Sequence, residues 1–243
     1  MVTSCRYRPA NLSRMSAIAL SIRGLSKSFA RGLARCRRRT LALVDVNLDL
    51  YRSEIVVLHG AAGAGKTTLL QCAAGLLRPD SGSVMAGHGF HGGRASPVAY
   101  VPAIPIYYPF LTVSDVVSLR ASRFDNRQAG VTDEALDLLE LHRVRNDIVA
   151  TLSRSQLMRL CIAEAIVNNP VAVMIDTSDS NSFTERNSLA RSLARVASAG
   201  IAVMIADRDE GALRPVAHRA IQLSEGCVLA FHPAPMFVAE HLH

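Results

Sequence analysis

Residues 55–70 read IVVLHGAAGAGKTTLL, and this stretch decides the fold. Its four leading apolar residues are typical of a short buried strand, and a glycine-rich turn and then a helix beginning at Lys66 follow. Gly60, Gly65, Lys66 and Thr67 match the P-loop pattern, in which a glycine, four residues and Gly-Lys-Ser/Thr surround a phosphate group. The sequence therefore predicts a binding site for a nucleoside triphosphate.

Each part of this stretch has a physical role in binding phosphate. Glycines let main-chain N–H groups curl around phosphate oxygens, and the helix N-terminus adds partial positive charge. The side chain of Lys66 reaches the β- and γ-phosphates, and the Thr67 hydroxyl binds Mg²⁺. Lys66 is one of only two lysines in a chain with 25 arginines, which makes its position informative. The predicted loop contacts to ATP are Gly60, Ala61, Ala62, Gly63, Ala64, Gly65, Lys66, Thr67 and Thr68.

Composition bounds the class of protein. The chain has 243 residues, of which 49% are apolar, and a formal charge of +7, so it can bury a core and carries a basic surface. Residues 95–114 lack charge, but their four prolines exclude a continuous spanning helix. We expect no membrane span and no signal peptide, so that any lipid-embedded part belongs to another chain. The scattered cysteines suit a reducing cytoplasm and are Cys5, Cys36, Cys72, Cys161 and Cys227.

The order of apolar runs predicts the organisation of the chain. Residues 1–16 look like a basic N-terminal tail in which Met15 is an alternative start to Met1, and 17–243 form one domain with a helical insert at about 103–150. Short apolar runs alternating with helices predict a mostly parallel sheet covered on both faces. Strands are expected at 17–22 and 41–50, and Thr132 is expected to cap a helix.

A basic loop is predicted between the first two strands. Residues 31–39 read RGLARCRRR, with five arginines and no acidic residue. Such a loop can contact anionic lipid or nucleic acid, or it can simply be solvated. No aromatic residues interleave with the arginines, which favours the solvated loop over a contact with lipid or nucleic acid.

A second apolar run supplies the other element that P-loop proteins need. Residues 171–175 read VAVMI and are followed by Asp176. An aspartate at the end of a strand next to the P-loop holds Mg²⁺. The predicted metal ligands are therefore Thr67 and Asp176.

The order of these motifs resembles the nucleotide-binding domain of ATP-binding cassette (ABC) transporters over residues 18–231. Residues 152–156 read LSRSQ where that family has its Leu-Ser-Gly-Gly-Gln signature, and Phe29 stands where the family stacks an aromatic ring on adenine. Further matches are Arg159, Ala163, Ala165, residues 168–170, residues 100–102, residues 109–113 and residues 223–226. The resemblance implies a P-loop α/β core with an N-terminal antiparallel β subdomain and a helical subdomain.

The departures from the family pattern fall on residues that support hydrolysis. The family's catalytic glutamate is Thr177 here, its glutamine is Ala103, and its histidine is Arg208. The D-loop aspartate is Phe183, and the first signature glycine is Arg154. A threonine hydroxyl is no general base at neutral pH, and losing one general base typically costs on the order of a hundred- to ten-thousand-fold in rate.

An alternative base would have to come from a nearby carboxylate. The candidates in the sequence are Asp179, Asp207 and Asp209, which follow the two apolar strands. Position decides whether any of them reaches the attacking water.

The resemblance implies a head-to-tail dimer that binds ATP and Mg²⁺ in the cytoplasm, on the inner face of the cell membrane. Ser153 and Gln156 would contact the ATP of a second ATP-binding subunit, and residues 107–110 would anchor a membrane-spanning permease subunit or pack inside the helical subdomain. We predict weak or absent hydrolysis at the chain's own site. The alternatives are a soluble ABC-type protein that acts on nucleic acid and a scaffold that does not hydrolyse ATP. We do not expect nucleic acid to be a partner.

Overall fold

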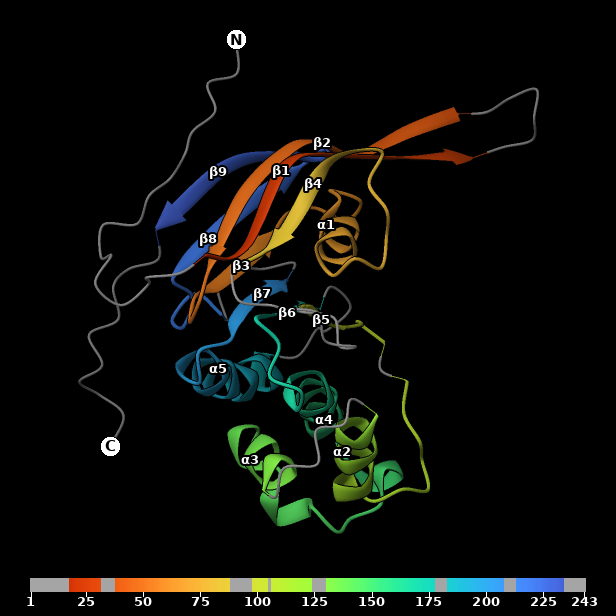
Figure 1. Ribbon diagram of the computed structural model, residues 1–243, viewed down its shortest axis with the longest axis vertical. Helices are drawn as coiled ribbons and strands as arrows, with labels where there is room; N and C mark the ends of the chain where they lie inside the picture. Colours follow the sequence, from red (N-terminus) through yellow and green to blue (C-terminus); the bar gives the residue numbers. More distant parts are fainter. Residues whose placement is uncertain are drawn as a thin grey trace.

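The computed structural model arranges the chain as two β-sheets with helices packed around them (Figure 1). It describes residues 18–31, 38–87, 98–104, 106–123, 130–177, 183–207 and 213–233; the predicted tail at 1–16 lies outside these ranges. The strands are β1 (Ile18–Arg31), β2 (Arg38–Tyr51), β3 (Ile55–His59), β4 (Ser81–Ala86), β5 (Val98–Val101), β6 (Ala172–Asp176), β7 (Ala202–Ala206), β8 (Arg219–Ser224) and β9 (Cys227–Pro233). The helices are α1 (Lys66–Ala73), α2 (Val113–Ser122), α3 (Val131–Leu138), α4 (Arg154–Ile166) and α5 (Phe183–Ser198), with short 3₁₀ turns η1 (His142–Val144) and η2 (Val149–Thr151).

The smaller sheet contains three antiparallel strands in the order β2-β1-β4. Its first two strands each run for 14 residues, well beyond the strands expected at 17–22 and 41–50. The extension pairs Phe29 with Thr40 and Arg31 with Arg38, so the ends of the predicted basic loop belong to the strands. Pairing between these two consecutive strands lengthened both of them past their alternating patterns.

The larger sheet has the order β5-β6-β7-β3-β8-β9. All of its neighbouring pairs are parallel except β8 with β9, which form an antiparallel hairpin at the edge. The strand of the P-loop, β3, therefore lies between β7 and β8. This arrangement confirms the predicted α/β P-loop core with its antiparallel β subdomain.

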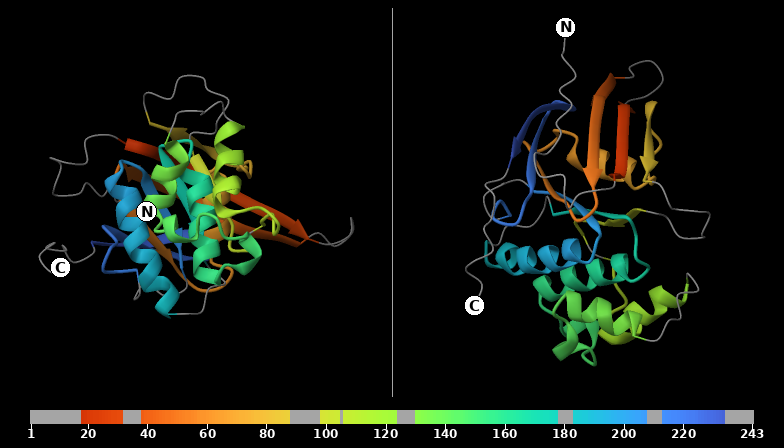
Figure 2. Two further views of the ribbon diagram at one scale, coloured as in Figure 1. Left: turned by 90° about the horizontal axis from the view of Figure 1, so that it is seen from below. Right: turned by 60° about the vertical axis from the view of Figure 1, so that its left-hand side comes forward.

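The two faces of the larger sheet have separate cores. On one face, side chains such as Val56, Leu58 and Met174 pack with α1 and with the three-stranded sheet. On the other face, Val57, Ile175 and their neighbours pack with α4 and α5. Figure 1 shows α1 between the two sheets and α4 and α5 beyond the larger one, and Figure 2 repeats this layering from the side. The prediction of a sheet covered on both faces is confirmed.

Helices α2 and α3, with η1 and η2, lie beyond α4 and continue the core of that face. Thr112 caps α2 through a capping box with Asp115. The expected cap of α3 was wrong: Gly130 occupies the N-cap with φ 90°, and Thr132 lies inside the first turn. None of the helices within the described ranges has the length and apolar composition needed to cross a membrane.

Candidate nucleotide-binding site

The P-loop connects β3 to α1 and is held by close backbone contacts on two sides. A Cβ at Gly60 would lie 2.1 Å from the carbonyl oxygen of Leu223 in β8, and one at Gly65 would lie 2.3 Å from that of Ala42 in β2. The turn of the edge hairpin adds a bond from the Gly226 N–H to the Ala64 carbonyl at 3.0 Å. Packing therefore requires glycine at both positions.

The N-terminus of α1 has the features of an anion site. Gly65 is its N-cap, with φ 105°, and no side chain caps this helix. The first N–H groups of a helix have no partner within the helix, and the helix dipole favours negative charge beside them. A glycine-rich loop before a helix of this kind suits the phosphate chain of ATP, because main-chain donors can approach the oxygens without Cβ clashes.

Lys66 lies buried against its own loop. Its Nζ donates to the carbonyl oxygens of Gly60 at 2.6 Å and Ala61 at 3.0 Å. Two backbone carbonyls of the loop therefore hold the ammonium group, and its contact with the β- and γ-phosphates stays a prediction. The predicted position of Lys66 beside the glycine loop therefore agrees with its geometry.

Thr67 and Asp176 come together from α1 and the end of β6. The Thr67 hydroxyl donates to Oδ2 of Asp176 at 2.5 Å, and Asp176 is buried. One hydroxyl and one carboxylate are a donor set that suits Mg²⁺, which takes few protein ligands and completes its shell with phosphate oxygens and water. The two predicted metal ligands are thus adjacent although 109 positions apart in sequence.

Thr177, by contrast, faces into the sheet. Its side chain is buried, and its hydroxyl donates to the carbonyl oxygen of Ala206 at 2.8 Å, beside a backbone bond from its own N–H to the same oxygen at 3.0 Å. The hydroxyl therefore fastens the end of β6 to the end of β7. In this arrangement the Thr177 hydroxyl is a structural link between strands.

The other hydrolytic positions give a mixed result. Ala103 is partly buried and offers no polar side chain. Asp207 follows β7, is fully buried, and its N–H donates to the Leu58 carbonyl at 3.0 Å. Arg208, Asp179 and Asp209 lie outside the described residues, and Phe183 begins α5 without a described side chain.

Ser153 and Gln156 form the N-terminal capping box of α4. The Ser153 hydroxyl accepts from the Gln156 N–H at 3.2 Å, and Oε1 of Gln156 accepts from the Ser153 N–H at 2.8 Å. These two side chains fix where α4 begins. Helix α4 packs on the face of the sheet opposite α1, so the signature segment and the P-loop helix belong to different faces.

Phe29 lies on the β1–β2 hairpin with 40% of its surface exposed. The Nζ of Lys27 lies 5.7 Å from the centre of its ring, a cation–π arrangement. Asp80 holds Lys27 at 3.1 Å and also accepts from the Ser28 hydroxyl at 2.6 Å. The ring is thus presented by an ordered polar cluster and remains accessible for stacking on a flat ligand.

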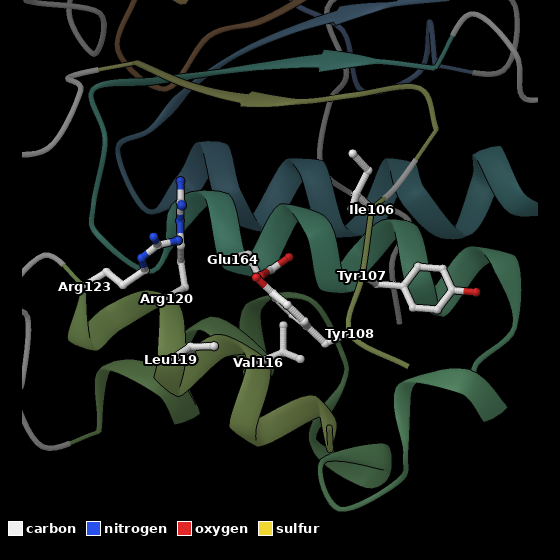
Figure 3. Close-up of a pocket in the computed structure, with 8 residues that line it drawn as sticks. All are labelled: Ile106, Tyr107, Tyr108, Val116, Leu119, Arg120, Arg123 and Glu164. Atoms are coloured by element: carbon white, nitrogen blue, oxygen red, sulfur yellow. The ribbon is translucent and has the colours of Figure 1, made fainter. Parts of the chain in front are cut away.

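A pocket of about 240 Å³ lies between the segment after β5 and helices α2 and α4 (Figure 3). Burial raises the pKa of Glu164 on its α4 wall to about 7, partly opposed by the charge of Arg120. In Figure 3 the Glu164 carboxyl group lies beside Tyr108, whereas the Tyr107 ring points away. The sequence reasoning missed Glu164, although it is the only charged residue in the otherwise apolar run 160–167.

The segment that borders this pocket exposes apolar side chains. Ile106 and Phe110 are each 89% exposed, and Tyr107 and Tyr108 are also exposed. The exposure of these side chains argues against packing of residues 107–110 inside the helical subdomain. An anchor for a permease subunit remains the alternative that fits.

A family profile described as ABC transporter matches residues 43–179, which include the P-loop, the signature segment and Asp176. The chain belongs to the ABC transporter family. Family membership implies that the P-loop described above binds ATP. The strands and helices that carry these motifs are those of the ABC nucleotide-binding domain, which confirms the resemblance found in the sequence.

Individual ABC proteins match this chain over about three fifths of its length or more. The SkfA peptide export ATP-binding protein SkfE of Bacillus subtilis (strain 168) is 32% identical over 152 residues, covering 60% of this chain and 63% of that protein. The aliphatic sulfonates import ATP-binding protein SsuB 1 of Nocardia farcinica (strain IFM 10152) is 36% identical over 159 residues, covering 65% of this chain and 58% of that protein. The chain thus spans about three fifths of the length of these two ABC relatives.

A solved ABC structure has the same fold. The cbiO1 protein of Clostridium perfringens, part of the ABC transporter complex cbiONQ, superposes with a TM-score of 0.74 at 20% identity. The match covers 90% of this chain and 89% of that one. The two sheets and the helices described above are therefore the ABC architecture over nearly the whole chain.

Proposed function

We propose that the chain is the ATP-binding subunit of an ABC transporter, that it binds Mg·ATP, and that it hydrolyses ATP weakly or not at all at its own site. The observation that carries this proposal is an intact phosphate cradle next to a Thr177 that is turned into the sheet. Residues 17–243 would act as one ATP-binding domain with the helical region at about 103–150, located in the cytoplasm at the inner face of the cell membrane.

The nucleotide would be held along the loop and at both of its ends. Main-chain N–H groups from Gly60 to Thr68 would surround the phosphates, and Lys66 would exchange its two carbonyl partners for phosphate oxygens. Phe29 would stack on the adenine ring, since its face is accessible. Mg²⁺, when bound, neutralises phosphate charge, and Thr67 and Asp176 would hold it.

Weak hydrolysis follows from what stands near the phosphates. A general base must lie within about 2.6–3.2 Å of the water that it activates, or act through one further water. The Thr177 hydroxyl is engaged with Ala206, and Asp207, though a carboxylate, is fully buried. Ala103 has no group that could orient the water.

A second ATP-binding subunit would complete the site. Because α4 and α1 pack on opposite faces of the sheet, we do not expect a chain to bring its own signature segment onto its own P-loop. The N-terminus of α4, with Ser153 and Gln156, would instead meet the ATP of a partner chain. The partner would be a second copy or a related subunit.

A membrane-spanning permease subunit would dock on the exposed segment. Ile106, Tyr107, Tyr108 and Phe110 offer apolar anchors beside a pocket, which is the combination that protein interfaces favour. The relatives named above are an export and an import protein by name, so they do not fix a direction of transport for this chain.

An ATP titration tests this proposal directly. Binding of a fluorescent ATP analogue with Mg²⁺ to the purified chain should be saturable, and Lys66→Ala should weaken it at least tenfold. Phosphate release should stay near background under the same conditions. Rapid release that Lys66→Ala abolishes would contradict weak hydrolysis, and absence of saturable binding would contradict the nucleotide site itself.

A further inference from the structure

The aromatic ring of Phe29 stands outside the apolar core. Leu25 is the last buried residue on the described part of β1, and Phe29, four positions further on, is 40% exposed. Packing in the core therefore does not fix the orientation of the ring. A charged group lies against it instead, because the Nζ of Lys27 is 5.7 Å from the ring centre.

Lys27 is itself held in place. Its Nζ donates to the carbonyl oxygen of Arg78 at 2.7 Å and to Oδ1 of Asp80 at 3.1 Å, and only 15% of its side chain is exposed. A surface lysine normally moves among many rotamers, and these two acceptors remove much of that freedom. The ammonium group is therefore an ordered charge on one face of the Phe29 ring, and a flat ligand would stack on the opposite face.

Asp80 joins this lysine to the main chain of the hairpin. Its Oδ2 accepts from the Ser28 N–H at 2.9 Å and from the Ser28 hydroxyl at 2.6 Å, and its own N–H donates to the Ser26 carbonyl at 2.8 Å. Hydrogen bonds from Ser28 and Lys27 hold the pKa of the Asp80 carboxyl well below its usual range, so the carboxylate stays charged. One carboxylate thus fixes both the backbone just before Phe29 and the cation on its ring.

The hairpin places this ring at a suitable distance from the P-loop. Strand β2 meets the loop at Ala42, whose carbonyl oxygen lies 2.3 Å from the position of a Cβ at Gly65. Phe29 pairs with Thr40, two residues from Ala42 on the same strand. At about 3.3 Å per residue, these two points are roughly 7 Å apart along β2. A ribose spans a gap of that order between the phosphates and the base of a nucleotide.

We propose that Lys27 and Asp80 are positioning residues for the nucleobase, which hold the Phe29 ring in the orientation on which adenine stacks. The identity of the ligand rests on the proposed function, whereas the contacts that order the ring do not. A side chain that is ordered before binding loses less freedom when the ligand arrives. For one side chain that saving corresponds to about a two- to tenfold gain in affinity.

Two other roles for Lys27 lead to different expectations. If its ammonium group bound the phosphates directly, its loss would weaken the binding of any triphosphate, with or without a base. If it only stabilised the hairpin through Asp80, its loss would lower the Tm and leave ATP affinity unchanged. A ligand without a base therefore separates these roles from positioning of the ring.

Titrations of matched variants with two ligands test the proposal. The test variant Lys27→Met removes the charge and keeps an unbranched side chain, and Lys27→Arg restores a cation. The control is Arg23→Met, because Arg23 lies on the same strand and forms a partly exposed ion pair with Asp49 at 2.5 Å. Each variant is titrated with Mg·ATP and with the magnesium complex of inorganic triphosphate, which has no base.

Lys27→Met should bind ATP about two- to tenfold more weakly and inorganic triphosphate as tightly as the parent chain does. Lys27→Arg should recover most of the ATP affinity, and Arg23→Met should bind both ligands like the parent. Asp80→Asn should also weaken ATP binding alone, and it carries the same test if thermal melting shows that Lys27→Met does not fold. Equal losses for the two ligands, or an unchanged ATP affinity, would overturn the proposal.

A double-mutant cycle connects the effect to the ring. Phe29→Ala should lower ATP affinity about 5- to 150-fold, as loss of a stacking partner does for a base. In that background Lys27→Met should have no further effect on ATP affinity, because no ring is left to orient. The same loss in both backgrounds would refute the positioning role. A parent chain that binds neither ligand would contradict the proposed function and this inference with it, whereas ATP binding that does not respond to Lys27 would contradict this inference alone.

Discussion

Replacing Gly65 by alanine should destabilise the protein more than the same change at Gly63, two positions earlier in the same loop. Both glycines have positive φ, 105° and 81°, so both substitutions place a side chain in a region that L-residues avoid. Placing a residue other than glycine in this left-handed region lowers the free energy of unfolding by about 1–2 kcal/mol. The two variants therefore share the loop, the Gly→Ala change and the positive φ, and they differ in what surrounds the new side chain.

The difference comes from what the new Cβ would meet. At Gly65 it would lie 2.3 Å from the Ala42 carbonyl oxygen and 3.2 Å from the Leu43 side chain, whereas at Gly63 nothing lies within 4 Å. Relieving a clash with the backbone of β2 adds about 1–3 kcal/mol, as overpacking does in cores. We expect a total of about 2–5 kcal/mol for Gly65→Ala and about 1–2 kcal/mol for Gly63→Ala.

Urea denaturation and thermal melting of the two variants measure this difference. At roughly 2–4 °C per kcal/mol for a chain of this size, Gly65→Ala should lower the Tm by about 10 °C and Gly63→Ala by about 4 °C. ATP affinity should also fall in Gly65→Ala, because the loop must move away from β2. Equal Tm changes in the two variants would refute the close packing of the P-loop against β2.

Three other substitutions probe the site and its support. Thr177→Val should lower the free energy of unfolding by about 1 kcal/mol through the lost hydrogen bond to Ala206. It should leave ATP affinity unchanged, as well as turnover in a phosphate-release assay. A large fall in turnover would show that the hydroxyl takes part in hydrolysis. Arg219→Met should lower the free energy of unfolding in urea by about 3–5 kcal/mol. The buried Glu54 carboxylate lies 3.0 Å from the Arg219 guanidinium and would lose its counter-charge. The double variant Glu54→Leu/Arg219→Met should recover part of that loss. Glu164 has a pKa raised by burial from 4.5 to about 7, so the folded state binds its proton more tightly than the unfolded state. Stability should therefore fall as pH rises from about 4.5 to 7, and Glu164→Gln should flatten that slope in melting curves across this range.

The parts of the site that the sequence predicted correctly depend on local pattern. The strand before Gly60 and the helix beginning at Lys66 are encoded within one stretch of 16 residues. Asp176 could be assigned because an apolar run of strand length ends there. In each case the residues that decide the structure are neighbours in sequence.

The parts that the sequence did not predict depend on distant segments. The Thr177 hydroxyl finds its acceptor 29 residues away, in a neighbouring strand. The length of β1 and β2 follows from their mutual pairing, and the Gly130 cap of α3 replaced the expected Thr132 because the chain enters that helix with a positive φ. Hydrogen-bond partners and entry angles of this kind are set by tertiary context and not by residue type.

Under the proposed head-to-tail pairing, the retained and the altered motifs would act on different nucleotides. If chains pair head to tail as proposed, Thr177 and Ala103 affect the ATP on this chain's own P-loop, whereas Ser153 and Gln156 affect the ATP of the partner. Loss of hydrolytic groups and retention of the signature serine are then compatible. A chain altered in this way would still complete a competent site on its partner. It would present Arg154 to the partner's ATP, in place of the signature glycine that allows the backbone to approach the nucleotide closely. Measuring hydrolysis with a competent partner subunit carrying its own intact P-loop, with and without Ser153→Ala in this chain, would separate the two effects. A fall in turnover with Ser153→Ala would place the contribution of this chain at the partner's nucleotide.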